Sequence, residues 1–295
     1  MAKYFGPEKY GEMPHPTHQA KDFTLELKDQ SFTEIRRKLG PFPFDKHSQR
    51  ELSQLQKDLP AIKTSWTNAP VYYDSHKQYY EGDVVDKVNL PHGMGQQYKP
   101  GSYLLEGFFR TGAPNGYVRS INNFHVQEGE MIKGKFTGFG IQTSLPNKEY
   151  QMPLCRRIGM FENGIFTNFG FESFDTGQWY LGHLKDEKFE GYGKLRTAQG
   201  YYLEGNFKEN KLQGQGVIFM KTKTEPAQGH FYQGKFKDSV LLDGGGVMGV
   251  YEKEKGVFHL YEAVFEGSRV VSAKPMQKII DEVEFRIPGR TVIEI

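Results

Sequence analysis

The sequence predicts an all-β repeat fold in which β-hairpins stack side by side into an antiparallel sheet. Three observations lead to this expectation. Glycine (34 residues) and aromatic residues (14%) are abundant while the hydrophobic fraction is only 37%, a balance that suits pleated strands and turns better than helices. Glycines also recur at a regular interval in aromatic or apolar surroundings. A G-x-G signal keeps step with them along the chain.

The regular glycines define the repeat. Their intervals cluster near about 23 residues, with longer ones where the chain carries insertions. An eighth position keeps the surrounding pattern but has lost its glycine, in the segment YEAVF at residues 261–265. The repeat-defining glycines are Gly82, Gly107, Gly129, Gly159, Gly182, Gly205 and Gly234.

The G-x-G signal lies nine residues after its anchor glycine in most copies. Clean examples begin at Gly138, Gly191 and Gly214. One copy has Asn168 in place of the first glycine, and asparagine is the residue that next best tolerates a positive φ. Two glycine signals locked at one offset are far more specific than a single glycine motif.

Each repeat has the features of a hairpin with one apolar face. Residues two apart share a face of a strand, so Tyr180, Gly182 and Leu184 point the same way. The glycine leaves a slot that a ring of the neighbouring strand can cover, and one hairpin cannot bury such a face alone. The other face is expected to be solvated, because it carries Glu81, Glu106, Glu128, Glu204 and Glu262.

The pattern Tyr-x-Gly-x-Phe, followed by a turn and G-x-G, resembles the MORN repeat (membrane occupation and recognition nexus). The best copies are residues 180–193 (YLGHLKDEKFEGYG) and 203–216 (LEGNFKENKLQGQG). Seven copies and the degenerate eighth span about residues 79–267. The resemblance implies an elongated, gently twisted, single-layer antiparallel sheet. Gln127 and Arg157 depart from the pattern by replacing the first aromatic residue.

The flanks divide the chain into three predicted parts. Residues 1–78 form an extended arm with two short helices, residues 79–267 the repeat domain, and residues 268–295 a C-terminal cap. Capping-box pairs predict the helix starts, Ser31 with Glu34 and Ser48 with Glu51. The chain from 61 to 74 is expected to be extended. In the cap, residues 274–284 predict a short helix and the tail 290–295 (RTVIEI) a last strand.

The arm has too little apolar content to fold by itself, so it needs another surface. It either lies along the repeat sheet and covers the apolar face, or docks on a partner, and we favour the partner. Basic clusters in the arm and the repeats could meet acidic protein tails or anionic lipid, with ordinary solvated charge as the alternative. The candidate partner-binding residues are Phe32, Ile35, Arg36, Arg37, Leu52, Leu55, Trp66, Arg156, Arg157, Lys221 and Lys223.

The sequence offers no pattern for catalysis, a cofactor or a metal. No G-x-G copy follows a strand and opens a helix, as a nucleotide-binding loop requires. The nine histidines lie without paired metal-ligand spacing. Cys155 is the single cysteine, so it has no disulfide partner in the chain, and no partner triad for a catalytic thiol is recognisable. The net charge of +2 gives no general attraction to nucleic acid.

These observations predict a non-catalytic scaffold, and the resemblance implies its setting. MORN-only proteins with short flanking arms resemble components of cilia and radial spokes. We therefore expect a microtubule-associated or radial-spoke-like component of the ciliary axoneme, with axonemal or cytoskeletal partners that could include acidic tubulin tails. No apolar run approaches the roughly 20 residues of a membrane span, and no signal peptide is apparent, so the expected location is the cytoplasm and its cytoskeleton. The alternative is a peripheral module that binds membrane phospholipid.

Overall fold

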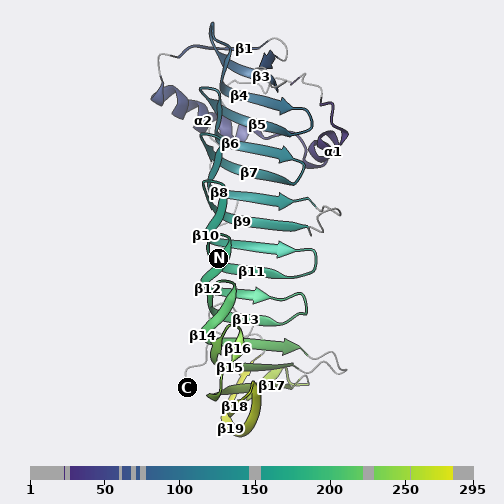
Figure 1. Cartoon of the computed structure of the whole chain (residues 1–295), viewed down its shortest axis with the longest axis vertical. Helices are drawn as coiled ribbons and strands as arrows, with labels where there is room; N and C mark the ends of the chain where they lie inside the picture. Colours follow the sequence, from purple (N-terminus) through teal and green to yellow (C-terminus); the bar gives the residue numbers. More distant parts are fainter. Residues whose placement is uncertain are drawn as a thin grey trace. The chain divides into compact units, whose positions relative to one another are not determined.

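The computed structural model describes residues 23, 27–59, 62–67, 71–73, 78–145, 154–221, 229–252 and 254–281 (Figure 1). Strands make up most of these residues, and two helices precede the repeats. The chain divides into two compact units, residues 1–135 (unit 1) and 136–295 (unit 2). Within each unit, antiparallel hairpins follow one another in chain order, which confirms the all-β fold of stacked hairpins. The predicted domain boundaries at residues 78 and 267 mark where the repeat pattern begins and ends. The division into two compact units follows packing and does not test those boundaries.

Unit 1 begins its sheet with two short strands of the arm. Both of these strands pair with β3. Strand β1 pairs with the second half of β3, and β2 pairs with the first half of β3. From β3 to β7 each strand pairs with the next, always antiparallel. The extended conformation expected between 61 and 74 is therefore confirmed where the structure describes it. The strands are β1 (Thr64–Trp66), β2 (Val71–Tyr73), β3 (Gln78–Val85), β4 (Leu90–Lys99), β5 (Tyr103–Arg110), β6 (Ala113–Asn122) and β7 (His125–Ile132).

Unit 2 continues the same construction. Consecutive strands pair antiparallel from β8 to β15, then β15 pairs with both β16 and β17, and β18 and β19 complete the series. The strands are β8 (Lys135–Ser144), β9 (Cys155–Glu162), β10 (Ile165–Phe174), β11 (Trp179–Lys185), β12 (Lys188–Arg196), β13 (Tyr202–Lys208), β14 (Lys211–Lys221), β15 (Gly229–Lys237), β16 (Val240–Leu241), β17 (Gly244–Glu252), β18 (Val257–Glu266) and β19 (Arg269–Asp281).

A row of glycines crosses the strands in register. The second glycine of each G-x-G lies opposite the anchor glycine of the following strand, as Gly193 does opposite Gly205. In unit 2 the row is unbroken over eight strands, and in unit 1 Val118 replaces one member. This register confirms the two coupled glycine signals. The unit 2 row is Gly140, Gly159, Gly170, Gly182, Gly193, Gly205, Gly216 and Gly234.

Two-residue turns close the hairpins, with both central residues at positive φ. Asp186 and Glu187 adopt φ values of 49° and 64°, and Glu209 and Asn210 values of 50° and 68°. Such mirror-image turns match the twist of the strands that they join. The second turn residue also donates its N–H to the preceding hairpin, as Asn210 does to the Phe189 carbonyl at 3.1 Å. Each turn therefore ties one repeat to the one before it.

The two predicted helices exist, but both predicted starts are wrong. Helix α1 (Gln30–Leu39) begins before Ser31, with Asp29 as N-cap residue and no side-chain cap bond. Helix α2 (Phe44–Asp58) begins four residues before Ser48, directly after Pro43. The start of α2 is set by packing, because Phe42 and Phe44 are both buried and the fixed φ of proline suits a helix entry. The predicted stop of α1 at Gly40 is confirmed by its φ of 75°.

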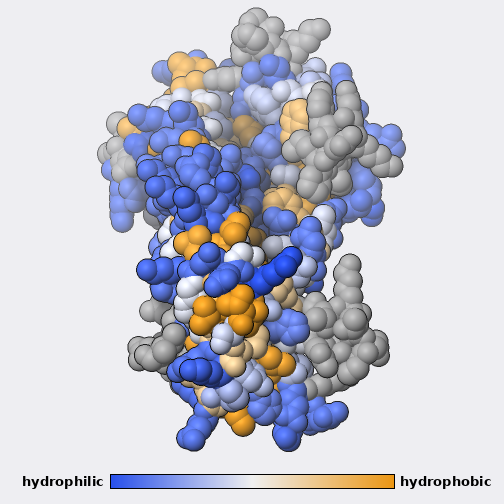
Figure 2. All heavy atoms as spheres, turned by 60° about the horizontal axis from the view of Figure 1, so that its bottom comes forward, coloured by the Kyte–Doolittle hydropathy of each residue, from blue (hydrophilic) through white to orange (hydrophobic). Residues whose placement is uncertain are grey.

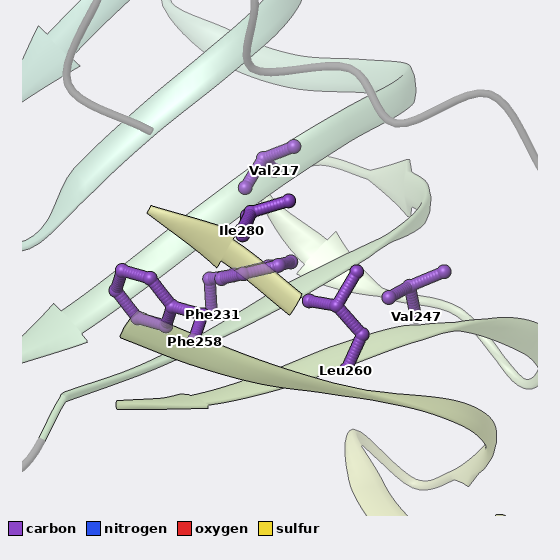
Figure 3. Close-up of a cluster of buried hydrophobic side chains, with 6 residues drawn as sticks. All are labelled: Val217, Phe231, Val247, Phe258, Leu260 and Ile280. Atoms are coloured by element: carbon purple, nitrogen blue, oxygen red, sulfur yellow. The ribbon is translucent and has the colours of Figure 1, made fainter. Parts of the chain in front are cut away.

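The predicted C-terminal helix is wrong over its described residues, because β19 occupies them and pairs with β18. Met276, Ile279 and Ile280 fit a helical spacing in sequence, yet the segment pairs as a strand, with Ile279 opposite His259 and Ile280 opposite Phe258. Pro275 lies beside a register shift, where its missing N–H is tolerated. Ile280 joins a buried cluster that β14, β15, β17 and β18 complete (Figure 3). The tail 290–295 lies outside the described residues.

Candidate interaction surface

Each repeat strand presents two distinct faces. The glycine face carries the anchor glycine and the residues two positions away, and the opposite face carries the residues between them. On β11 the glycine face holds Tyr180, Gly182 and Leu184, all buried, while His183 on the opposite face is exposed. Every one of the seven repeat-defining glycines is buried. The close-packed face of the sheet is therefore the glycine face.

Tyrosine rings fill the glycine slots. Tyr180 lies over Gly182 and Gly193, and a Cβ added at Gly193 would lie 2.5 Å from the ring Cζ. The Tyr180 hydroxyl donates to the His183 carbonyl at 2.8 Å, and Phe189 stacks on the ring at a centroid distance of 3.7 Å. Tyr80 covers Gly82 and Gly95 in the same way. A ring covers each of these anchor glycines, but the expectation that it comes from the neighbouring strand is wrong, because Tyr180 and Tyr80 belong to the anchor glycine's own strand.

Arg157 replaces the first aromatic residue of its repeat and is neutralised inside the chain. Its Nε donates to Glu172 and an Nη to Glu187, both at 2.7 Å, and its guanidinium lies 5.6 Å from the Phe166 ring centroid. Arg156 belongs to the opposite face and is exposed. The predicted basic pair is thus split between the two faces, and Arg156 alone remains at the surface.

In unit 1 the arm covers the opposite face. Phe42 and Phe44 form a buried cluster with Met94 of β4 and Phe108 of β5. Leu52, Trp66 and Tyr117 pack against this cluster, and α2 contacts β4, β5 and β6. His47 of α2 stacks on Tyr117 at a centroid distance of 3.8 Å. The arm therefore packs on its own sheet, on the face opposite to the glycines.

A buried ion-pair network accompanies this packing. Glu106 is 0% exposed and accepts from Arg36 of α1 at 3.0 Å and from Arg119 of β6 at 3.4 Å. Arg119 also pairs with Glu128 at 2.5 Å and donates to the Gly40 carbonyl at 2.9 Å. Burial raises the pKa of Glu106, and the two guanidinium groups oppose that rise.

The expectation of a solvated acidic face is therefore wrong for three of its five residues. Glu81 and Glu106 are buried in unit 1 and Glu204 is buried in unit 2. In unit 2 the cause is a cross-strand cation, because Lys194 pairs with Glu204 at 2.9 Å. Glu262 is exposed, as expected.

The structure places the candidate partner-binding residues of the arm mostly against its own sheet. Phe32 and Leu55 are buried, which leaves neither to face a partner, and Ile35 is half-buried. Arg36 is held by Glu106, whereas Arg37 is exposed and pairs with Glu34 of its own helix at 3.1 Å. For these residues packing on the chain's own sheet replaces docking on a partner, but the covered face is the one opposite the glycines and not the apolar glycine face that the covering alternative named. Lys221 ends β14 without a described side chain, and Lys223 lies outside the described residues.

In unit 2 the opposite face of β8 to β12 exposes large apolar side chains. Phe139 is 51% and Phe169 42% exposed, and Met160 and Tyr192 are exposed as well. These residues stand inside the G-x-G signal or directly after the anchor glycine. Sequence reasoning missed them, although the signal was present: the middle residue is aromatic in GFG, NFG and GYG.

The described residues supply little for chemistry. Cys155 is buried, and burial followed by the neighbouring Glu172 charge raises the pKa of its thiol to about 12. In the described part of the chain no cluster of histidine, cysteine and carboxylate side chains is suited to a metal ion. None of the described helices has the length and apolar character of a membrane span.

Comparison with known proteins gives a distant relationship. No family model matches the chain. The chain is 25% identical to Alsin from Rattus norvegicus over 234 residues, which cover 70% of the chain and 14% of Alsin. It is 26% identical to Alsin from Homo sapiens over 188 residues, or 54% of the chain and 11% of Alsin. Alsin contains MORN repeats, so the match supports a MORN-like repeat here. The chain thus corresponds to a small part of these relatives.

Proposed function

We propose that the chain is a non-catalytic scaffold, a protein–protein interaction component of a large cytoskeletal assembly. The observation that carries this proposal is the group of exposed apolar residues in unit 2, which includes Phe139 and Phe169. Exposed contiguous apolar residues on an otherwise polar surface mark interaction sites. The distant similarity to a MORN-containing protein agrees with a repeat of this kind.

The proposed setting is the ciliary axoneme, and the proposed partners are axonemal or cytoskeletal proteins. Acidic tubulin tails are one such partner, because Arg156 is exposed beside these apolar residues. The absence of catalysis is part of the proposal. It is supported by the buried Cys155, whose raised pKa is the reverse of what a nucleophilic thiol needs.

The competing function is a peripheral module that binds membrane phospholipid. The exposed Arg156 next to exposed apolar residues favours it. Against it, three of the basic side chains proposed for contact are engaged in the chain, Arg36 with Glu106, Arg37 with Glu34 and Arg157 with Glu172. Binding to anionic headgroups grows with the number of free cations near the surface, so the scaffold is the stronger proposal.

Detergent fractionation of ciliated cells that express the tagged full-length chain tests the proposal. A scaffold of the axoneme stays with the microtubule fraction after detergent removes the membranes, and its affinity purification recovers axonemal proteins. Release of the chain into the detergent-soluble fraction, together with sedimentation on anionic phospholipid vesicles, would establish the membrane function instead. Release without vesicle binding would remove the axonemal assignment.

A further inference from the structure

The opposite face of β8, β9, β10 and β12 carries a group of exposed and half-buried apolar side chains, called here the open face, and β11 adds the exposed His183 opposite Phe169. Figure 2 shows hydrophobic residues reaching the surface in patches between hydrophilic ones. Register brings the open-face residues together: Phe139 lies opposite Met160 and Ile158 opposite Phe171. At the far end of unit 2, Val217 and Phe231 belong to the same face but are buried in the cluster of Figure 3. The open face consists of Phe139, Ile158, Met160, Phe169, Phe171 and Tyr192.

Unit 1 shows what an occupied face looks like at matching positions. On β5 the three residues Leu104, Glu106 and Phe108 are all 0% exposed, with Phe42 and Phe44 of the arm packed on Phe108 and Arg36 paired with Glu106. The matching residues on β9 are Arg156, Ile158 and Met160, of which the first and last are exposed. The face opposite the glycines is therefore present in both units. In unit 1 the chain's own arm covers this face.

The charges beside the apolar residues are reversed between the two units. In unit 1 the sheet supplies carboxylates and the arm supplies guanidiniums, with Arg36 on Glu106 at 3.0 Å and Arg50 on Glu130 at 2.5 Å. In unit 2 one cross-strand row borders the open face and holds two arginines and no carboxylate. That row is Thr143, Arg156, Ser173, Trp179, Arg196 and Tyr202. Arg196 of this row is half-buried and donates to the Gly177 carbonyl at 2.6 Å, and on the other side of the apolar residues Glu162 is an exposed carboxylate. A complementary occupant carries carboxylates.

From this reversal we infer that the open face binds an amphipathic helix of a partner protein, with Phe or Leu on its apolar side and carboxylates facing Arg156 and Arg196. This inference rests on the proposed function and specifies the class of partner. Five strands spaced about 4.8 Å apart span about 19 Å, which a helix of about 13 residues crosses. Helix α2, of 15 residues, packs against three strands of unit 1, β4, β5 and β6.

A second copy of the arm is a poorer occupant than an acidic helix. The last turn of α1 is basic, with Arg36, Arg37 and Lys38. On the open face these side chains would meet Arg156 and Arg196, and like charges brought together oppose docking. The arm also already has its own site in unit 1, where Phe42 and Phe44 are buried.

Fluorescence anisotropy with synthetic peptides and the full-length chain tests the inference. The probe is a labelled helix of roughly 18 residues with Leu and Phe at helical spacing and Glu on both flanks. Three controls accompany it: a scrambled sequence of the same composition, a version with Lys for every Glu, and an acidic peptide without apolar residues. Hydrogen exchange of the complex locates the contact.

Only the acidic helix is expected to bind, with protection on β8 to β12. Phe169→Ser should weaken binding about tenfold or more, whereas Val240→Ser, which also alters an exposed side chain, should leave binding unchanged. Arg156→Glu should shift the preference toward the lysine version. Because Phe169 and Arg156 are exposed, their variants are expected to fold, and circular dichroism checks this.

Several results would overturn the inference. These are equal binding of the scrambled or purely acidic peptide, protection elsewhere than β8 to β12, or no binding at all. Concentration-dependent self-association that Phe169→Ser abolishes would assign the face to a second copy. Vesicle binding that the same variant abolishes would assign it to lipid. If the helix does not bind but the chain still fractionates with axonemes, the helix partner fails while the proposed function stands.

Discussion

At the scale of single residues, the repeat depends on glycines that leave room for a ring. Gly193→Ala would bring a Cβ within 2.5 Å of Cζ of Tyr180. The ring is wedged by Phe189, so it cannot withdraw freely. Overpacking of this kind costs about 1–3 kcal/mol. We predict that Gly193→Ala lowers the free energy of unfolding by that amount in chemical denaturation.

Gly245→Ala is the matched control, because nothing lies within 4 Å of a Cβ added there. Its effect should stay within about 0.5 kcal/mol. A double-mutant cycle with Tyr180→Leu isolates the cause: in the absence of the ring, Gly193→Ala should cost much less. Additive losses in the double variant would show that the ring is not what the glycine accommodates.

Cys155 supplies a second test at this scale. Burial and the Glu172 charge raise the pKa of its thiol to about 12, so almost no thiolate exists at neutral pH. We predict that iodoacetamide alkylates the native chain far more slowly than the chain unfolded in denaturant, as followed by mass spectrometry. Equal rates in the two states would mean that the thiol is accessible and that the described burial is wrong.

The residue scale is also where the sequence was most informative. The anchor glycines could be predicted because the close contact between strands and the covering ring leave no room for a side chain at these positions. Glycine therefore recurs in the sequence at a fixed spacing. Partner identities could not, because they depend on the packing of distant segments. Arg36, for example, lies 70 positions from Glu106 in the sequence, yet the two form an ion pair. Nothing local distinguishes that arginine from the exposed Arg37.

At the scale of elements, the docking of α2 gives a stability prediction. Phe44 is buried between the arm and Phe108, at a ring distance of 6.1 Å. Phe44→Ala should destabilise the docked arm by about 3 kcal/mol or more, read as faster hydrogen exchange across α2. Leu39→Ala, at an exposed helix position, should have little effect. Unchanged exchange in Phe44→Ala would contradict arm docking through this cluster.

The same helix predicts a pH dependence through His47. Burial lowers the pKa of His47, and the nearby Arg50 and Lys46 lower it further, against a small opposite effect of Glu128. With the folded pKa below the unfolded value of about 6.5, the unfolded arm takes up the proton first. The stabilisation is therefore present above that value and lost as the pH falls through it.

We predict that α2 exchanges faster at about pH 5.5 than at about pH 7.5, and that His47→Phe reduces this difference. Phenylalanine retains the stack on Tyr117 but cannot be protonated. His92, Glu51 and Glu106 also have shifted pKa values, but they are common to both proteins and cancel in the comparison. An identical pH dependence in the variant would exclude His47 as a cause.

Elements at the chain ends were the hardest to predict. The segment from Lys274 has helical apolar spacing, yet it pairs with β18, whose edge away from β17 would otherwise leave its backbone N–H and C=O groups unpaired. The capping pair Ser48 and Glu51 predicts a start of α2 that is too late, because the burial of Phe42 and Phe44 fixes the helix start four residues earlier. In both cases tertiary packing overrode a local signal.

At the scale of the molecule, the repeat content predicted the sheet, but not which surface it leaves for partners. The arm was expected to be the docking segment, and the structure places most of its apolar residues on its own sheet. The exposed surface is instead in unit 2, where aromatic residues stand inside the G-x-G signal. Exposure could not be foreseen, because matching positions in unit 1 are buried by a segment remote in sequence.

We propose that the open face is the surface by which the chain attaches to its assembly. The most direct test expresses the Phe139→Ser/Phe169→Ser variant in ciliated cells and measures its share in the detergent-resistant axonemal fraction. Val240→Ser/Val271→Ser is the control, since both valines are exposed away from the open face. We predict loss of the first variant from the fraction and full retention of the second, with equal circular dichroism spectra. Equal retention of both variants would contradict the claim.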